Sequence, residues 1–115
     1  MVNYRRLDAV FAALADPTRR RMIERLARRS MSVGEMSEGL AMSQPGVSKH
    51  VKVLERAGLL KREIVGRVHR CKLEPKVMEA ASTWLDDQRR FWSGALERLD
   101  VYLARTPKSK AKKGR

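Results

Sequence analysis

Residues 43–60, SQPGVSKHVKVLERAGLL, form the stretch that decides the fold. Ser43 is a residue type that caps helices, and the following Gln44-Pro45 suits a first helical turn. Apolar residues then recur at helical spacing and define an inward stripe of Val47, Val51 and Leu54. Gly58 ends the pattern, as glycine commonly does after a helix. The stretch therefore predicts a short amphipathic helix that begins after Ser43 and ends before Gly58.

The face opposite this stripe is small, polar and basic. With roughly 100° of rotation per residue, Pro45, Lys49 and Lys52 point directly away from the core, and His50 lies on the flank. No acidic residue occurs before Glu55, so the first turns of the helix would not repel a phosphate backbone. A face of this size and charge fits the major groove of B-DNA, which is about 12 Å wide.

Side chains near the start of this helix have the chemistry for reading bases. Gln44 can pair with an adenine edge and Lys49 with the acceptors of guanine, and Ser48 can bond to bases or phosphates. The other interpretation is an amphipathic surface helix whose polar face is merely solvated.

A β-hairpin is expected after the helix, because the apolar period changes to alternation. Residues 60–65 and 68–73 alternate as two strands, joined by a turn containing Gly66. Basic side chains cluster on this hairpin, namely Lys61, Arg62, Arg67, Arg70 and Lys72. Arg67 is expected at the tip, and Arg67 and Arg70 are expected to contact DNA, where such side chains could straddle the backbone and enter the adjacent minor groove.

Three helices are predicted before the deciding stretch and one after the hairpin. Helical spacing places the first over residues 6–15, and Asp16-Pro17-Thr18 opens a second that reaches about residue 28. A capping box at residues 32–35 opens a third, ending near residue 40. Pro75 reopens helix, with a break or bend expected near Ser82. The predicted fold class is mainly α with a small β-hairpin wing, that is, a winged helix-turn-helix.

Composition indicates one small domain with a polyanionic partner. The 115 residues carry 26 Lys and Arg against 13 Asp and Glu, a formal net charge of +13. We expect a DNA-binding and dimerisation domain over residues 1–105 and a disordered basic tail over 106–115. No apolar run approaches the roughly 20 residues that span a bilayer, and no signal peptide is evident, so a cytoplasmic location without membrane attachment is expected.

The deciding stretch resembles the recognition segment of ArsR-type winged-helix repressors, which commonly reads S-Q-x-x-V-S-x-H-L-x-x-L-x-x-A-G-L-V. The positions in register are Ser43, Gln44, Val47, Ser48, His50, Leu54, Ala57, Gly58 and Leu59, with conservative departures at Val51 and Leu60. Upstream, residues 14–20, LADPTRR, look like the family's L-x-D-P-T-R-x entry to its second helix. With Gly66-Arg67 the resemblance spans residues 6–74.

This resemblance implies homodimers that bind palindromic operators and repress transcription. It also implies that Gln44, Ser48 and His50 contact DNA. The aromatic C-terminal part, with Trp84 and Trp92, looks like a branch of the family without a recognisable metal-ligand set.

Two apolar stripes predict a homodimer through the first and last helices. The first stripe contains Leu7, Val10 and Phe11, and the second contains Leu85, Trp92, Leu96, Leu99 and Leu103. Together they are broader than one small core needs, and a two-fold pairing would set two recognition helices about 34 Å apart. The alternative is packing on the chain's own core, and we expect both in part, with Trp92, Leu96 and Leu99 nearest the partner.

No cofactor or metal is predicted, and any effector is unknown. In metal-sensing ArsR-type proteins, the third helix commonly carries a motif similar to L-C-V-C-D-L. The matching residues here are 31–36, MSVGEM, with serine and glycine at the two cysteine positions. The histidines, His50 and His69, lie in the recognition helix and the wing rather than in the last helix. Cys71 is expected to be a small buried thiol, with a redox switch as the alternative. An apolar ligand between the terminal helices near Trp84 and Trp92 is a further alternative.

Other function classes fit less well. No nucleophile elbow, phosphate-cradling glycine loop or spaced carboxylate pair indicates an enzyme. A non-specific architectural nucleic-acid binder is the main alternative, because the charge of +13 supplies sequence-independent attraction. RNA is disfavoured because the major groove of an A-form helix is too narrow for the predicted recognition helix.

Overall fold

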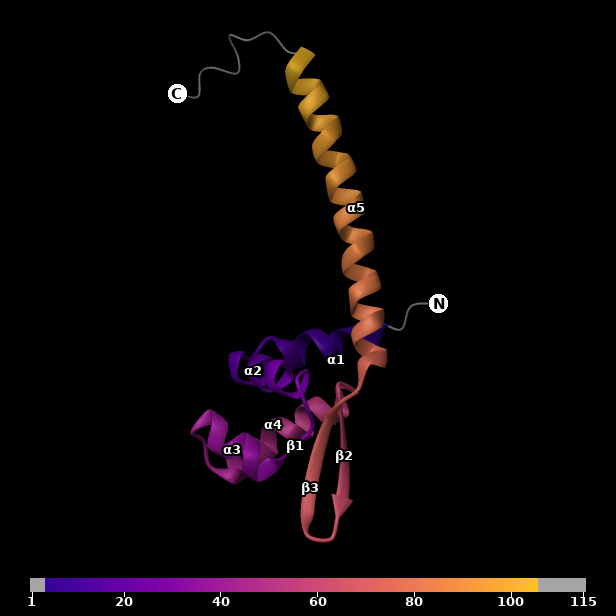
Figure 1. Cartoon of the computed structure of the whole chain (residues 1–115). Coiled ribbons are helices and arrows are strands. Elements are labelled where there is room, and N and C mark those ends of the chain that lie inside the picture. Colours follow the sequence, from indigo (N-terminus) through magenta and orange to yellow (C-terminus); the bar gives the residue numbers. More distant parts are fainter. Residues whose placement is uncertain (1–3, 106–115) are drawn as a thin grey trace. The chain divides into compact units, whose positions relative to one another are not determined.

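The computed structural model describes residues 4–105 (Figure 1). The elements in chain order are α1 (Tyr4–Leu14), α2 (Pro17–Leu26), β1 (Met31–Ser32), α3 (Val33–Leu40), α4 (Gln44–Arg56), β2 (Leu60–Val65), β3 (Val68–Leu73) and α5 (Pro75–Arg105). This order confirms the predicted fold class, a mainly helical chain with a β-hairpin wing after the helix-turn-helix. The predicted tail, residues 106–115, lies outside the described residues.

The junction between α1 and α2 explains the LADPTRR motif. The Asp16 carboxylate caps α2 by accepting hydrogen bonds from the backbone nitrogens of Thr18 and Arg19, at 2.8 and 3.1 Å. Arg19 and Arg20 then donate back to the end of α1, Arg19 Nε to the carbonyl of Ala13 at 2.6 Å and Arg20 Nη1 to that of Leu14 at 2.8 Å. The motif thus supplies partners for polar groups at both helix ends, which otherwise lack them.

The predicted capping box at the start of α3 is present. Ser32 Oγ accepts from the backbone nitrogen of Glu35 at 3.1 Å, and Glu35 Oε1 accepts from the backbone nitrogen of Ser32 at 2.9 Å. These two bonds fix where α3 begins and leave α3 and α4 as the two helices of the helix-turn-helix.

The wing belongs to a three-stranded antiparallel sheet with strand order β1-β3-β2. The predicted hairpin is confirmed, with Leu60 opposite Leu73 and Val65 opposite Val68. Strand β1 was not predicted, because its two residues are too short to show alternation. It adds to the sheet by placing Met31 opposite Cys71.

The core of the first compact unit, which extends to Ala81, gathers side chains from α1 to α4 and from the base of the sheet. The largest fully buried side chains are Met22, Met36, Leu54, Leu59, Val10, Val47, Val51 and Cys71. Gly58 ends α4 with a φ of +81°, and a Cβ there would lie 3.1 Å from Val77 Cγ1. Glycine therefore suits this turn on two grounds, backbone conformation and space.

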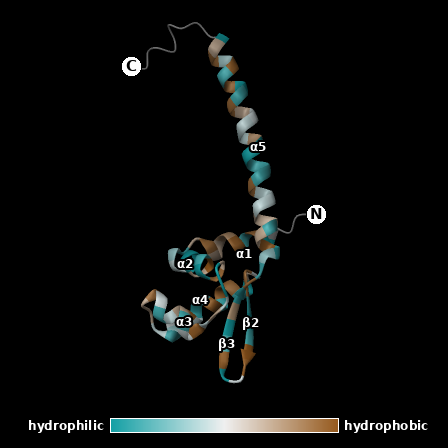
Figure 2. Cartoon of the chain, viewed as in Figure 1, coloured by the Kyte–Doolittle hydropathy of each residue, from teal (hydrophilic) through white to brown (hydrophobic). Residues whose placement is uncertain are grey.

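Helix α5 is continuous from Pro75 to Arg105, so of the expected break or bend near Ser82 the break is wrong, and the bend stays a prediction. The sequence between Pro75 and Gly94 contains neither proline nor glycine, and a serine in mid-helix costs too little to end the helix. The part from Ser82 onward forms the second compact unit. Figure 2 shows apolar and polar residues alternating along this helix. Among residues 4–105, the helices are all too short or too polar to cross a lipid bilayer.

Candidate nucleic-acid interface

Helix α4 has one fully buried face and one exposed polar face. Its inner stripe, with no exposed surface, is Val47, Val51 and Leu54. The residues exposed on the other side are Gln44, Pro45, Lys49 and Lys52, while Ser48 and His50 are partly exposed. Neither Lys49 nor Lys52 forms an ion pair within residues 4–105, so both ammonium charges remain available to an anion.

The turn before α4 is held by local hydrogen bonds that set the direction of the helix. Ala41 ends α3 in the left-handed region with a φ of 53°, a conformation that costs a non-glycine residue about 1–2 kcal/mol. The buried Ser37 hydroxyl donates to the carbonyl of Met42, and Ser43 Oγ accepts from the backbone nitrogen of Gly46 at 3.2 Å. These contacts offset the strain and keep the first turn of α4 facing outward.

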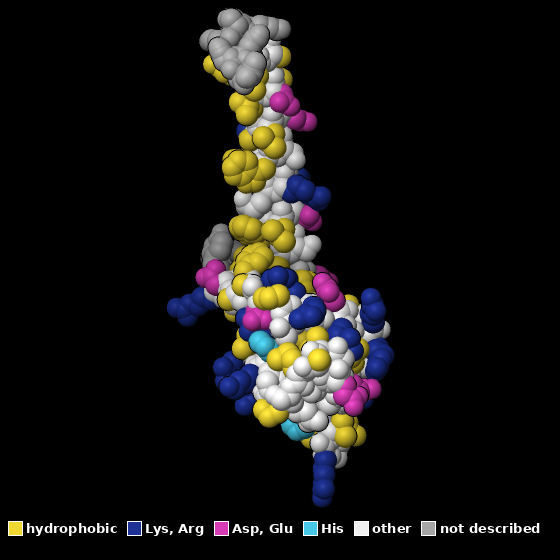
Figure 3. Space-filling view, turned by 90° about the vertical axis from the view of Figure 1, so that its left-hand side faces the viewer, with side chains coloured by type: hydrophobic (Ala, Val, Ile, Leu, Met, Phe, Trp, Pro, Cys, Tyr) yellow, Lys and Arg dark blue, Asp and Glu magenta, His cyan; other side chains and the backbone are white. Residues whose placement is uncertain are grey.

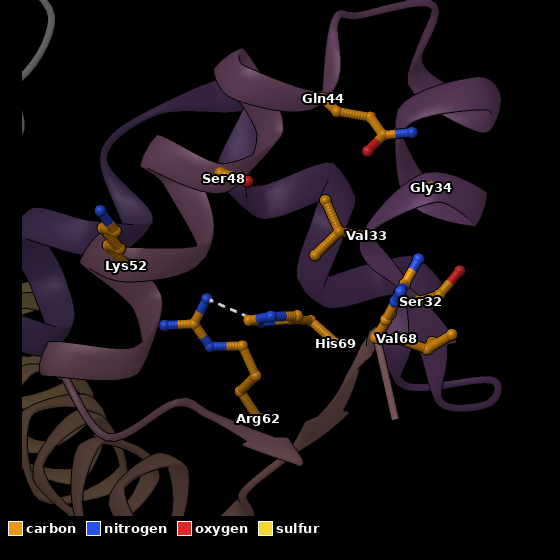
Figure 4. A pocket seen from close by; sticks show the side chains of 10 residues that line it. Ser32, Val33, Gly34, Gln44, Ser48, Lys52, Arg62, Val68 and His69 are labelled. Atoms are coloured by element: carbon orange, nitrogen blue, oxygen red, sulfur yellow. Dashed lines mark hydrogen bonds between the residues drawn. The ribbon is translucent and has the colours of Figure 1, made fainter. Parts of the chain in front are cut away.

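A groove of about 590 Å³ separates the start of α3, the outer face of α4 and the wing (Figure 4). The residues that line it are Ser32, Val33, Gly34, Gln44, Ser48, Lys52, Arg62, Arg67, Val68 and His69. Of the predicted DNA-contacting residues, the structure brings Gln44, Ser48, Lys52 and Arg67 together in this groove. None of the lining side chains is acidic, so the groove has the charge that suits a polyanion.

Arg62 connects the wing to α4 at one side of the groove. Its Nη2 donates to Glu55 Oε1 at 2.8 Å, and its Nη1 lies 3.4 Å from His69 Nδ1. Figure 4 shows the Arg62 guanidinium and the His69 ring facing each other between α4 and the wing. The sequence pattern predicts Arg62 in the basic cluster and His69 in the wing, but it does not indicate that either belongs to the site. Alternation along each strand does not reveal which residues of two strands become neighbours.

The two predicted wing arginines differ in their surroundings. Arg67 is exposed and forms no ion pair among residues 4–105, as expected for a residue after Gly66 at the tip. Arg70 lies instead near the start of α3, with its Nε 3.3 Å from Ser30 Oγ and its Nη1 3.9 Å from Glu35 Oε1. The Glu35 carboxylate thus already balances part of the charge of Arg70. The local geometry therefore favours a DNA contact for Arg70 less than for Arg67, and the contact stays a prediction.

His50 lies on the flank of α4, as the helical spacing predicts. Its Nδ1 is 3.3 Å from Arg19 Nη1, so the imidazole contacts α2 as well as lying beside the outer face of α4. No other side chain of α4 is joined to α2 by a hydrogen bond among residues 4–105.

The residues predicted for dimerisation fall into two groups. Leu7 and Val10 are 5% and 1% exposed in a single chain, because α1 turns them into the core of its own unit, and their part in dimerisation stays a prediction. Phe11 is partly exposed. The residues of α5 are all about half exposed or more, namely Leu85, Trp92, Leu96, Leu99 and Leu103. Figure 3 shows apolar side chains gathered along one side of α5 and charged ones along another.

Two carboxylates near the helix-turn-helix have lowered pKa values. The backbone hydrogen bond from Ser32 is the main cause for Glu35, and the charges of Arg29 and Arg70 lower its pKa further, against a smaller upward effect of burial. For Asp16, the backbone hydrogen bond from Arg19 is the main cause of a lowered pKa. Both carboxylates therefore stay ionised to a lower pH than an ordinary Asp or Glu side chain.

Cys71 is a buried free thiol, as expected from its place on the inner face of β3. Burial raises its pKa above the ordinary 9.0, with the nearby Arg62 opposing the shift. Since the thiolate is the reactive form, both burial and the raised pKa disfavour the redox alternative. Among residues 4–105, no three His, Cys, Asp or Glu side chains form a group that could hold a metal ion.

Comparison with known proteins identifies the class of the domain. Residues 14–63 match a family model described as a helix-turn-helix domain. Over 96 residues the chain is 43% identical to the HTH-type transcriptional regulator Rv2034 of Mycobacterium tuberculosis, covering 84% of this chain and 87% of that protein. It is 28% identical over 79 residues to the transcriptional repressor SdpR of Bacillus subtilis, covering 69% and 88% of the two chains.

A solved structure agrees with these relatives. The crystal structure of the ArsR family transcriptional regulator RHA00566 superposes with a TM-score of 0.74 at 36% identity, covering 81% of this chain and 97% of that chain. The similarity therefore extends well beyond the helix-turn-helix itself.

Proposed function

The chain belongs to the ArsR family of winged helix-turn-helix transcriptional regulators, and we propose that it binds a palindromic DNA operator as a homodimer and represses transcription. The observation that carries the proposal is the outer face of α4. Gln44, Lys49 and Lys52 are exposed there above a stripe that is completely buried, so the helix can enter a groove without losing its packing.

In this proposal, the start of α4 reads bases and the surrounding cations hold the backbone. Gln44 pairs with adenine and Lys49 with guanine, since their side chains offer the matching donors and acceptors. Ser48 bonds to a base or a phosphate, and Pro45 makes apolar contact at the first turn. Lys52 and Arg67 contact phosphates, which fixes the register of the protein without reading sequence.

We place the dimer contact on the apolar side of α5, with a smaller part for Phe11. Leu85, Trp92, Leu96, Leu99 and Leu103 share one side of the helix at about 100° per residue, and all are solvent-exposed in a single chain. The ring centroids of Phe91 and Trp92 lie 5.8 Å apart in an edge-to-face pair, which adds to the apolar surface. A second copy related by a two-fold axis would cover this surface and supply the second recognition helix.

In this proposal, the protein represses transcription because it occupies promoter DNA. A dimer with two recognition helices about 34 Å apart covers one face of a promoter and blocks the polymerase. Residues 1–105 suffice for binding and pairing, and the basic residues of 106–115 add attraction to phosphates. The proposed complex contains duplex DNA and two copies of the chain, with no membrane.

Selection of bound fragments from a random duplex library tests this function. An inverted repeat with half-sites about one helical turn apart is expected, together with a dimer in light scattering. A non-specific architectural binder is the second candidate, because a net charge of +13 attracts any nucleic acid. Enrichment of no sequence over the starting library would favour that candidate and contradict the operator proposal.

A further inference from the structure

We infer that Glu55, Arg62 and His69 form a positioning chain, which fixes the wing against α4 and presents His69 as a hydrogen-bond donor to a DNA phosphate in the groove. The inference rests on the proposed function and adds to it a phosphate-contacting residue and two residues that hold it in place. The cationic side chains around the groove are not equivalent.

Arg62 lines the groove, but its charge is already matched. Its Nη2 lies 2.8 Å from Glu55 Oε1, and the two side chains are 21% and 36% exposed, so water screens the pair only in part. Lys52 and Arg67 also line the groove, and they form no ion pair within residues 4–105. The net attraction for a phosphate therefore comes from Lys52 and Arg67, and Arg62 serves another purpose.

That purpose is to orient His69. The two residues lie on adjacent strands: Arg62 is opposite Cys71 and His69 is opposite Ile64, so both side chains emerge on the same side of the wing. Arg62 Nη1 is 3.4 Å from His69 Nδ1. A guanidinium can only donate, so Nδ1 must accept, and the proton of the neutral ring then resides on Nε2. The contact thus leaves the Nε2–H group of His69 as a hydrogen-bond donor, and it fixes the orientation of the ring.

The chain also joins three elements at a point where the wing leaves the core. Leu60 and Cys71, at the base of the hairpin, are buried, whereas Ile64, Val65 and Val68 near its tip are exposed. Arg62 on β2 lies level with Cys71 at the buried base, and His69 on β3 lies level with the exposed Ile64, so their contact runs from the base toward the tip. Loss of the Arg62–Glu55 pair would remove a direct tie between the hairpin and α4, and loss of the Arg62–His69 contact would remove what orients the imidazole.

A phosphodiester is the ligand chemistry that the groove fits. Besides His69, the groove is lined by the hydrogen-bond donors Lys52, Arg67 and Ser48, and no carboxylate lines it. A phosphodiester offers acceptor oxygens and negative charge, which match these donors. In the proposed complex, the DNA strand that borders the major groove supplies this phosphate.

The decisive experiment is a double-mutant cycle on DNA affinity, measured by fluorescence anisotropy over a range of salt concentrations. His69→Ala is expected to weaken binding to operator and scrambled duplexes alike by about tenfold, the loss expected for one hydrogen bond to a charged acceptor. Arg62→Ala should weaken DNA binding by about the same factor without changing its salt dependence. The double variant should bind DNA almost as tightly as either single variant. His69→Gln should recover part of the affinity, because its amide retains a donor.

If Arg62 instead contacted the phosphate directly, Arg62→Ala would reduce the salt slope by about one phosphate contact. The losses of binding free energy in Arg62→Ala and His69→Ala would then add in the double variant. Either result would overturn the inference. Lys61→Ala is the matched control, because Lys61 is another wing cation paired with a carboxylate, 3.9 Å from Glu74, and does not line the groove. Its DNA affinity should stay within about twofold of the wild type.

Two further experiments distinguish a failure of the inference about His69 from a failure of the operator proposal. Nitrogen-15 NMR of the wild-type protein should show the His69 proton on Nε2, and a proton on Nδ1 would contradict the inference without any mutation. Millimolar inorganic phosphate at constant ionic strength should not displace the duplex, since displacement would assign the groove to a free anion. If the wild type cannot distinguish operator from scrambled DNA, the operator proposal fails, while the cycle still reports on His69.

Discussion

Arg19 Nη1 and His50 Nδ1 lie 3.3 Å apart, which links the first turn of α2 to the recognition helix. The same guanidinium donates through Nε to the carbonyl of Ala13, so α1, α2 and α4 meet at one side chain. Because a guanidinium can only donate, Nδ1 of His50 is the acceptor and its Nε2 remains for another partner. The LADPTRR and SQPGVSKH segments are thus joined directly by the contact between Arg19 and His50.

His50→Ala should weaken binding to every duplex by about tenfold without changing base preference. His50 lies on the flank of α4, so we expect its other ring nitrogen to contact the DNA backbone rather than a base edge. The loss corresponds to one hydrogen bond to a charged phosphate. Affinities for a panel of single-base operator variants would check this. A change in the rank order of that panel would show that His50 reads a base.

Arg67→Ala should reduce affinity for all duplexes and lower the salt slope by about one phosphate contact. Arg67 is exposed and lacks an ion pair among residues 4–105, so its whole charge is available. Arg70→Ala provides the comparison, because Glu35 already balances part of its charge. We expect the salt slope to change less for Arg70→Ala. Equal changes would show that the contact with Glu35 is lost on DNA.

Leu99→Glu should convert the proposed dimer to a folded monomer and reduce operator affinity by about a hundredfold, since the second half-site no longer contributes. Leu99 is 48% exposed, so the substitution leaves the core intact. Val101→Glu is a matched control, because Val101 is 50% exposed and lies on the opposite side of α5 at about 100° per residue. Light scattering at micromolar concentration would distinguish them. A dimer that survives Leu99→Glu but not Val101→Glu would place the interface on the other side.

Glu35→Gln should make the fold less sensitive to acid. The hydrogen bond from the Ser32 backbone, with the charges of Arg29 and Arg70, lowers the pKa of Glu35 below its ordinary 4.5. A group whose pKa is lower in the folded state stabilises the fold above its unfolded pKa, and this contribution is lost as the pH falls through the folded pKa. Glutamine keeps the capping acceptor but does not titrate.

Urea unfolding at about pH 7 and about pH 3 would measure this effect. The wild type should lose more stability than Glu35→Gln between the two conditions. Parallel losses would show that Glu35 contributes nothing to the acid sensitivity of the fold.

Local sequence signals predicted most of the helix-turn-helix and the wing. Helix starts at Asp16, Ser32 and Ser43 follow from capping chemistry that acts within three residues. The hairpin follows from alternation around Gly66. By contrast, Ser82 also looked like a cap, but nothing around it stops a helix, and α5 runs through it.

The remaining features depend on contacts between distant residues. The burial of Leu7 and Val10 depends on what packs against α1, which the apolar stripe alone does not reveal. The partners of Arg62 and Arg70 depend on strand register and on the position of α4 and α3 beside the sheet. The groove exists because three separate segments converge, so it has no signature in any one of them.

The central claim is that the outward side of α4 reads base sequence, and a competition assay tests it most directly. A labelled operator bound by the wild type is titrated with unlabelled operator and with a scrambled duplex of equal composition, and the assay is repeated with Gln44→Ala and Lys49→Ala. The wild type should strongly prefer the operator, and each variant should lose about 1–3 kcal/mol of that preference. Equal competition by the two duplexes, or variants that discriminate as well as the wild type, would contradict the account.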